Sequence, residues 1–123
     1  MTASTDSRQL VSSFLAAREN LDPKAADLMD EAFSFESPLM RIDDRHAYLQ
    51  TLRGFQELVK GVRMISELYG PDEASLLYDL DTTTPVGVQR TAEHFRIKEG
   101  KIASILVLFD SAPWRPLFEG KGL

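Results

Sequence analysis

The hydrophobic period of the chain changes near residue 60, and this change limits the folds that it can adopt. Before that point, apolar residues recur every three or four positions, as in an amphipathic helix. The stripe of the first expected helix contains Leu10, Val11, Phe14, Leu15, Arg18 and Leu21. After that point, apolar and polar residues alternate in short runs, as in strands. Helices followed by strands predict an α+β domain.

Three helices are expected in the first half. The second begins after Asp22, a good N-cap, and has Pro23 in its first turn. It carries Ala25, Leu28, Met29 and Ala32. The alternating segment Phe33–Pro38 then predicts a short strand. The third helix begins near Asp43 or Asp44 and ends at Gly61, with one apolar side made of Leu49, Leu52, Phe55, Leu58 and Val59.

Four strands are expected in the second half, at Val62–Tyr69, Ala74–Asp81, Val88–Lys98 and Lys101–Asp110. Turn signals separate them, and the last of these is the hairpin dipeptide Glu99-Gly100. Such strands form an antiparallel meander, and helices covering one face of a curved sheet would enclose a cavity. Pro113 and Pro116 are expected to break the tail.

The last strand is apolar on both of its faces. Ile102, Leu106 and Leu108 are expected on one face, with Ala103, Ile105, Val107 and Phe109 on the other. An antiparallel sheet normally leaves one face polar. The second apolar face therefore predicts a partner sheet, most simply in a homodimer. The alternative is that the tail, with Trp114 and Phe118, covers this strand.

Composition excludes several classes of protein. The 123 residues predict one domain, residues 1–123, and the net charge of −5 argues against nonspecific nucleic-acid binding. The absence of cysteine excludes disulfides and thiolate chemistry. The longest apolar run, Ile105–Phe109, is too short to span a membrane, and the polar N-terminus is unlike a signal peptide. A soluble cytoplasmic protein is expected.

Neither a metal nor a cofactor is predicted. His46 and His94, the only histidines, are far apart in sequence. Asp43 and Asp44 lie beside His46, but this group fits helix capping better than metal binding. The sequence also contains no glycine-rich phosphate loop.

Three passages resemble one known family. They are Leu21–Ala25 after the first helix, Phe33–Pro38 before the third helix, and the hairpin His94–Ile102, which Asp110 follows ten residues after Gly100. Their order and spacing resemble the nuclear transport factor 2-like (NTF2-like) superfamily, in its SnoaL-like branch. The resemblance implies a cone-shaped, cystatin-like roll, with three N-terminal helices packed on a curved antiparallel sheet around a deep apolar pocket. It also implies a dimer through the sheet.

This family includes ketosteroid isomerases, limonene epoxide hydrolases, polyketide cyclases, scytalone dehydratases and noncatalytic binders, so fold alone does not give function. Ketosteroid-isomerase-like members have a catalytic aspartate where this chain has Ser37, before Pro38. A serine cannot act as a carboxylate base, which argues against steroid-isomerase chemistry.

Asp79 and Asp81 are candidate catalytic residues, because positions two apart on a strand share a face. Two neighbouring carboxylates raise the pKa of one of them, which gives one proton donor and one acceptor. Tyr78 would assist them as a polar helper. The alternative is that Asp81 belongs to a turn and that Asp79 faces solvent, with Tyr78 and Leu80 inside.

Glu93 and His94 lie on the next strand and face opposite ways. The resemblance implies that Glu93 takes the place of a protonated acid in an oxyanion hole; if the register shifts by one, His94 becomes a candidate base instead. Asp110 falls where polyketide-cyclase-like relatives have an aspartate that acts as acid and base. Its alternative role is to turn the chain into Ser111.

The expected lining of the pocket is mostly apolar and consists of Phe14, Phe33, Phe35, Ser37, Leu52, Phe55, Ile105, Val107, Phe109 and Trp114. Such a lining favours a small apolar or aromatic ligand. Cofactor-free acid–base chemistry of the isomerase, cyclase, dehydratase or hydrolase type is one hypothesis. A noncatalytic ligand-binding or dimerisation module is the other, so whether the protein is an enzyme stays open.

Overall fold

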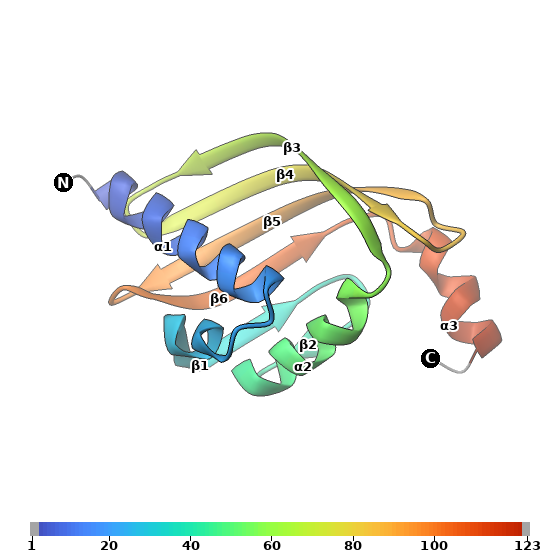
Figure 1. Cartoon of the computed structure of the whole chain (residues 1–123), viewed down its shortest axis with the longest axis horizontal. Helices are drawn as coiled ribbons and strands as arrows, with labels where there is room; N and C mark the ends of the chain where they lie inside the picture. The colour runs from blue at the N-terminus through green and yellow to red at the C-terminus, as the bar shows by residue number, and fades with distance from the viewer. Residues whose placement is uncertain (1–2, 122–123) are drawn as a thin grey trace.

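A computed structural model describes residues 3–121 and contains one six-stranded sheet with the strand order β2-β1-β6-β5-β4-β3 (Figure 1). The elements in chain order are α1 (Ala3–Glu19), the 3-10 helix η1 (Pro23–Leu28), β1 (Met29–Glu36), β2 (Arg41–Ile42), α2 (Arg45–Gln56), β3 (Val59–Tyr69), β4 (Glu73–Thr82), β5 (Val88–Lys98), β6 (Lys101–Leu108), the 3-10 helix η2 (Ala112–Trp114) and α3 (Arg115–Lys121).

The expected meander is present as β3 to β6, and each of these strands pairs antiparallel with the next. Glu99 and Gly100 join β5 to β6 with φ angles of 51° and 76°. Positive φ at both central residues is what a two-residue type I′ hairpin turn requires. Strand β1 joins the sheet beside β6 and runs parallel to it, which the meander alone does not predict.

The helices differ from the sequence expectation in three places. The second expected helix is only the 3-10 helix η1, because Met29 to Ala32 belong to β1 instead, and Met29 pairs with Ile102 of β6. Helix α2 ends at Gln56 rather than at Gly61, and Gly61 lies in β3 opposite Asp81. The tail forms the helix α3 despite Pro116, which stands near its start, where a proline costs little.

The two predicted N-caps, Asp22 and Asp44, are confirmed. Asp22 caps η1 by accepting a hydrogen bond from the Lys24 amide, at 2.9 Å. Asp44 caps α2 by accepting one from the Ala47 amide, at 3.0 Å. Both carboxylates satisfy amide groups that have no partner inside the helix.

A β-bulge changes which side chains of β6 share a face. Ile97 pairs with Ile102, but Arg96 pairs with Ser104, so one residue is extra in β6. Ile102 therefore joins Ile105 in the core instead of pointing the same way as Leu106 and Leu108, as strict alternation predicts. Leu106 and Leu108 remain exposed on the other face.

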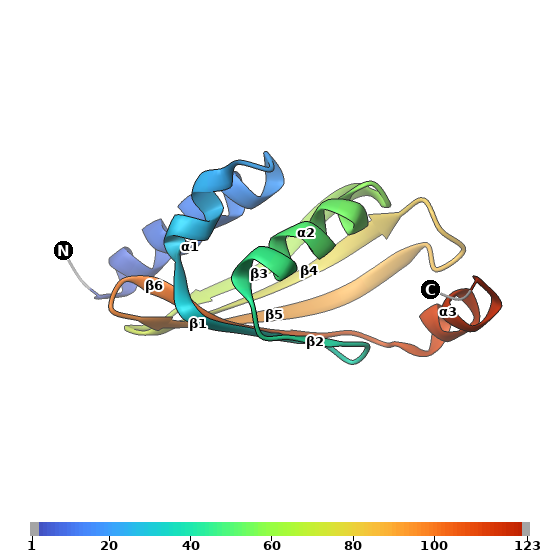
Figure 2. The same ribbon diagram turned by 90° about the horizontal axis from the view of Figure 1, so that it is seen from below.

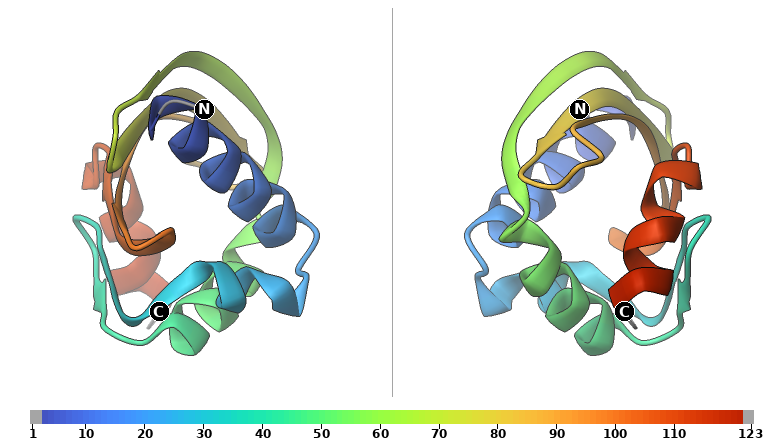
Figure 3. Two further views of the ribbon diagram at one scale, coloured as in Figure 1. Left: turned by 90° about the vertical axis from the view of Figure 1, so that its left-hand side faces the viewer. Right: turned by 90° about the vertical axis from the view of Figure 1, so that its right-hand side faces the viewer.

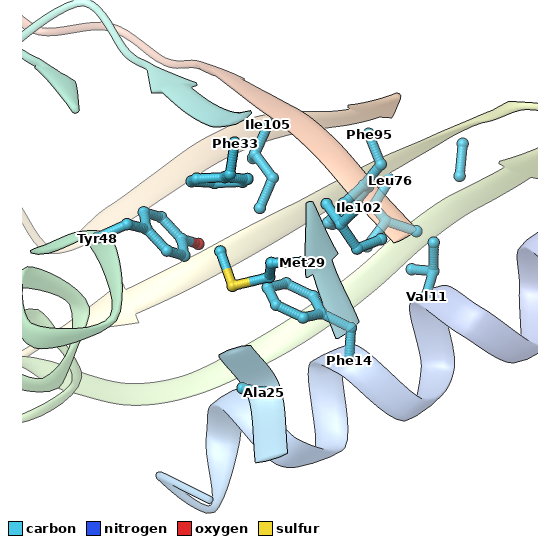
Figure 4. Packing of buried hydrophobic residues seen from close by; sticks show 11 residues of the cluster. Val11, Phe14, Ala25, Met29, Phe33, Tyr48, Leu76, Phe95, Ile102 and Ile105 are labelled. Carbon is cyan, nitrogen blue, oxygen red and sulfur yellow. The ribbon is translucent and has the colours of Figure 1, made fainter. Parts of the chain in front are cut away.

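Helices α1 and α2 lie on the same side of the sheet, which curves around them, and α3 lies beyond its end (Figures 2 and 3). The core fills the space between these layers, with Phe14 from α1, Tyr48 from α2 and Phe95 from β5 all buried (Figure 4). We call the face of the sheet toward α1 and α2 the inner face, and the opposite one the outer face. Among the described residues, no helix is both long and apolar enough to cross a membrane.

Candidate functional site

The inner face of β5 places a charged side chain in the core. Its inward positions are Gln89, Thr91, Glu93 and Phe95, and all four are buried. Glu93 is only 2% exposed. Burying a carboxylate costs several kcal/mol unless a partner compensates for its lost hydration, so the partners of Glu93 decide what this site is.

Arg18 from α1 is the principal partner of Glu93. Its Nη1 donates to Glu93 Oε2 at 2.6 Å and its Nη2 donates to Oε1 at 3.3 Å. The Arg18 side chain is 16% exposed, so it reaches from the surface to the buried carboxylate. Such a bidentate pair fixes the relative orientation of the guanidinium and the carboxylate, and it connects α1 to β5.

Two tyrosines complete a cluster that we call the inner cluster: Arg18, Tyr48, Tyr78 and Glu93. Tyr78 from β4 donates its hydroxyl to Glu93 Oε1 at 2.9 Å. Tyr48 from α2 accepts a hydrogen bond from Arg18 Nη1, also at 2.9 Å. Within residues 3–121, no buried side-chain nitrogen or oxygen lacks a partner. Four side chains from four elements therefore converge at one point inside the fold.

Burial sets the protonation states of this cluster. Burial would lower the pKa of Arg18, but the charge of Glu93 and the tyrosine contacts raise that pKa well above its usual value. Burial raises the pKa of Tyr48 to about 12, against the opposing effect of Arg18. Burial, and then the charge of Glu93, raises the pKa of Tyr78 well above its usual range. Both phenols are therefore neutral at physiological pH.

Aromatic rings surround the inner cluster. The Tyr48 ring lies 5.1 Å from Phe33 and 5.0 Å from Phe35, measured between centroids. The Arg18 guanidinium lies 5.5 Å from the Phe14 ring centroid, in cation–π range. The cluster is thus a small polar group packed among aromatic rings in the core.

The two aspartates of β4 lie on the outer face, away from Glu93. Asp79 is held between Arg90, at 2.9 Å, and Arg63, at 2.8 Å, and hydrogen bonds from Arg90 above all lower its pKa to about 2. Asp81 lies 3.9 Å from Lys60. The shared face predicted for Asp79 and Asp81 is therefore the outer one, while Tyr78 and Leu80 face inward.

The other polar candidates also lie outside the inner cluster. His94 faces outward, with Nδ1 2.7 Å from Ser75 Oγ and Nε2 3.2 Å from Glu73. The exposed Asp110 accepts a hydrogen bond from the Ala112 amide, which turns the chain after β6. The Ser37 hydroxyl accepts from the amides of Leu39 and Met40 in a local turn. Of the polar candidates, Glu93 and Tyr78 belong to the inner cluster, whereas Asp79 and Asp81 share the outer face.

Most of the expected apolar lining packs in the core. Phe14, Phe33 and Ile105 are buried, and Phe35, Leu52 and Val107 pack against the core while remaining partly exposed. The remaining expected residues lie apart from these. Phe109 is half-buried. Trp114 is buried, with its ring 5.9 Å from that of Phe55 and its indole N–H bonded to Gln89. The side chain of Phe118, expected over the last strand, lies outside the described part of the structure.

Two members of the inner cluster, Arg18 and Tyr48, are absent from the sequence-based candidates. The signal for Arg18 was a charge within the apolar stripe of the first helix, four residues after Phe14. A charged residue at such a position must either reach solvent or find a buried partner. Tyr48 gave a weaker signal, because a tyrosine at the start of a helix is compatible with core and surface alike.

Two surface hollows involve the outer face. One, of about 310 Å³, is lined by Gly61, Val62, Arg63, Asp79, Asp81 and Val88. The other, of about 270 Å³, is lined by Ser34, Glu36, Arg41, His94, Arg96, Ser104, Ile105 and Leu106. Across the described part of the chain, no three or more His, Asp or Glu side chains group in a way that could hold a metal ion.

No protein-family model matches the sequence, and no curated protein sequence matches it either. Solved structures do match. A protein from Kribbella flavida aligns with a TM-score of 0.80 at 23% identity, covering 97% of this chain and 98% of that one. An NTF2-like protein from Cytophaga hutchinsonii aligns with a TM-score of 0.69 at 23% identity, covering 91% and 94%. The chain has the NTF2-like fold.

A third match with the NTF2-like fold is a candidate ketosteroid isomerase from Kribbella flavida, with a TM-score of 0.72 at 18% identity, covering 91% of this chain and 83% of that one. Likeness at this identity shows the fold alone. The NTF2-like fold explains why the inner cluster lies between helices and curved sheet, but the chemistry must come from the four side chains themselves.

Proposed function

We propose that this protein binds a small apolar or aromatic molecule between its helices and the inner face of its sheet, against the inner cluster. The observation that carries the proposal is the buried Arg18–Glu93 ion pair, with Glu93 only 2% exposed. Replacing a buried ion pair by apolar residues of similar size is often neutral or stabilising, so such a pair is weak as a device for stability. Perturbed charged groups inside a fold are typical of functional sites.

The cluster also has the parts of an acid–base site. Glu93 would act as the proton acceptor, with Tyr78 donating to its Oε1, and Tyr48 would donate a hydrogen bond to an oxygen that becomes negative during the reaction. Isomerisation of a ketone is one reaction that such groups fit, with Glu93 as the carboxylate that Ser37 does not supply. Three hydrogen bonds from Arg18 and Tyr78 stabilise the charged form of the Glu93 carboxylate and make it a weaker proton acceptor. Catalysis is therefore the second part of the proposal, after binding.

Calorimetric titration with 2-naphthol, an aromatic with one hydroxyl group, tests the binding proposal. We expect saturable binding to the wild type, and weaker binding to Tyr48→Phe and Glu93→Gln. Naphthalene, which lacks the hydroxyl group, is the matched probe and should bind less tightly. Asp79→Asn on the outer face is the matched variant and should bind like wild type. Equal binding of both probes to every variant would show that the inner cluster does not hold the ligand.

The catalytic part has its own test. A panel of β,γ-unsaturated ketones, including a steroid one, would be assayed for double-bond migration by ultraviolet absorbance. We expect Glu93→Gln to abolish any turnover found, and Tyr78→Phe to reduce it. Undiminished turnover in Glu93→Gln would remove Glu93 from the mechanism.

We also propose a homodimer through the outer face. Leu68, Leu106 and Leu108 are exposed there. The chain exposes 7500 Å² of surface, whereas a monomer of this mass is expected to expose about 6,600 Å². The excess is comparable to the ~800 Å² that each partner buries in a standard interface.

Light scattering coupled to size-exclusion chromatography tests this arrangement. We expect a dimer for the wild type and a monomer for Leu106→Glu/Leu108→Glu. The control, Leu21→Glu, changes an exposed leucine in the connection after α1 and should remain dimeric. A monomeric wild type would contradict the dimer proposal.

A further inference from the structure

Three polar side chains form a row across adjacent strands on the outer face, and we call them the outer row: Ser34, Ser104 and Arg96. Ser34 of β1 is paired with Ser104 of β6, and Ser104 is paired with Arg96 of β5. Side chains of directly paired residues stand next to each other on one face of a sheet. All three line the surface hollow of about 270 Å³. The outer row therefore brings two hydroxyls and one guanidinium into one concave place.

The polar atoms of the outer row are open to a ligand. Among residues 3–121, no hydrogen bond or ion pair engages the side chains of Ser34, Ser104 or Arg96. Both serines are half-buried, yet no buried side-chain oxygen in that part of the chain lacks a partner, so their hydroxyls must reach solvent. Arg96 is exposed. The outer row thus offers hydrogen-bond donors that a molecule in solution can contact.

The other charged side chains around this hollow already have partners. Arg41 forms ion pairs with two carboxylates, at 3.2 and 3.1 Å, and one of these is Glu36 of the same hollow. Glu73 lies opposite Arg96 on β4, but its recorded ion pair is with His94, at 3.2 Å. Within the described chain, Arg96 therefore has no carboxylate partner, and the hollow has one uncompensated positive charge.

We infer that the outer row binds the carboxylate group of a small organic acid, at a site separate from the inner cluster. The Arg96 guanidinium can donate two parallel hydrogen bonds to the two oxygens of a carboxylate. The two serine hydroxyls can donate to the remaining lone pairs, because a carboxylate accepts about four hydrogen bonds. Leu106 lines the same hollow and is 36% exposed, so it offers an apolar contact to the body of the acid.

The charge of the hollow distinguishes a carboxylate from a phosphate group. One negative charge matches the uncompensated charge of Arg96. A doubly charged phosphate or phosphonate would leave one negative charge unmatched, in a hollow that Glu36 also lines. Like charges at such short range repel, and partial burial strengthens the repulsion. The outer row therefore favours a monoanion.

The outer row lies closer to the turn between β5 and β6 than the leucines of the proposed dimer surface do. The pair Arg96–Ser104 comes first from that turn, the pair His94–Leu106 comes next, and Leu108 lies further along β6. A bound carboxylate group would therefore lie at the margin of the proposed dimer surface.

An NMR titration of isotope-labelled protein with benzoate tests the inference and locates the site. We expect saturable binding in the millimolar range, because water weakens a contact with an exposed charge. The largest shifts should occur at the backbone amides of Ser34, Arg96 and Ser104. Benzamide has the same shape without the charge and should bind about tenfold more weakly. Phenylphosphonate, the doubly charged probe, should bind no more tightly than benzoate.

Three variants connect this binding to the outer row. Arg96→Gln removes both charge-assisted hydrogen bonds and should weaken benzoate binding about tenfold or more. Ser34→Ala/Ser104→Ala keeps the charge of the hollow and should weaken binding several-fold. Arg90→Gln is the matched control, because Arg90 is exposed on the same face of the same strand but is paired with Asp79. It changes the net charge equally and should bind benzoate like wild type.

Each contrary result has a definite meaning. A wild type without shifts in the outer row overturns the inference and leaves the proposed inner ligand site unaffected. Shifts confined to the inner cluster, as at the Tyr48 amide, would place benzoate there and also overturn it. An equal loss of binding in Arg90→Gln would attribute binding to the net charge of the protein. Tighter binding of phenylphosphonate than of benzoate would show that the carboxylate assignment is wrong.

Discussion

Glu93 and Asp79 lie on adjacent strands, and arginine holds both, but they lie on opposite faces of one sheet. Glu93 is buried with Arg18, whereas Asp79 lies between two arginines that are 66% and 72% exposed. The distances are similar, at 2.6 Å for the inner pair and 2.8 and 2.9 Å for the outer contacts. The distances alone therefore do not show which ion pair contributes more to stability. Water can replace a lost partner on the outer face, but it cannot do so in the buried inner cluster.

Removing the arginine from each pair should give the largest difference in stability between the inner and the outer pair. Arg18→Met leaves a buried carboxylate unpaired and should destabilise the fold by about 3–5 kcal/mol. Arg90→Met leaves Asp79 with Arg63 and with water, so we expect a much smaller loss. Urea unfolding of both variants measures the difference. Equal losses would mean that the inner pair is as accessible to water as the outer one.

Raising the pH should give the second-largest effect, a loss of folding stability through ionisation of Tyr48 in the inner cluster. The pKa of Tyr48 is about 12 in the folded protein and 10 in a free tyrosine. The unfolded chain therefore loses its Tyr48 proton first, so stability is intact below pH 10 and is lost as the pH rises toward 12. A two-unit shift corresponds to at most about 3 kcal/mol.

Tyr48→Phe should lose less stability than wild type over this alkaline range, as measured by urea unfolding at a series of pH values. Absorbance of ionised tyrosine provides an independent titration. Parallel pH profiles for Tyr48→Phe and wild type would contradict the burial of the Tyr48 hydroxyl.

Lowering the pH should give the smallest effect, a loss of folding stability through protonation of Asp79 on the outer face. The pKa of Asp79 is lowered to about 2 by Arg90 and Arg63, against a usual value of 3.8. Stability from this contact is therefore present above about pH 4 and is lost as the pH falls toward 2. Asp79→Asn should show a shallower loss over that acid range, and high salt should reduce the difference. A salt-independent difference would indicate that Asp79 is shielded from solvent.

Local signals in the sequence were sufficient for much of the fold. The turn at Glu99 and Gly100 fixes the hairpin of β5 and β6, and the limits of β5 were predicted correctly. Asp22 and Asp44 marked helix starts because a cap acts within three residues. The parallel pairing of β1 with β6 could not be predicted in this way, because it joins segments about 70 residues apart and overrides the helical preference of Met29 to Ala32.

The candidate site was less predictable for the same physical reason. A two-residue period shows that Asp79 and Asp81 share a face, but not that this face is the outer one. Glu93 was identified as a candidate, but its partner Arg18 lies 75 residues away on α1, and no local pattern links them. The bulge in β6 likewise moved Ile102 into the core, against strict alternation.

The proposed ligand site requires that the buried Arg18–Glu93 pair serves a ligand rather than stability. The most direct test is urea unfolding of wild type and Arg18→Met/Glu93→Leu, each with and without saturating 2-naphthol. We expect the double variant to be at least as stable as wild type without ligand, and we expect 2-naphthol to stabilise only the wild type. A double variant that is several kcal/mol less stable than wild type, or one that 2-naphthol stabilises as much as wild type, would show that the buried pair serves stability instead of a ligand.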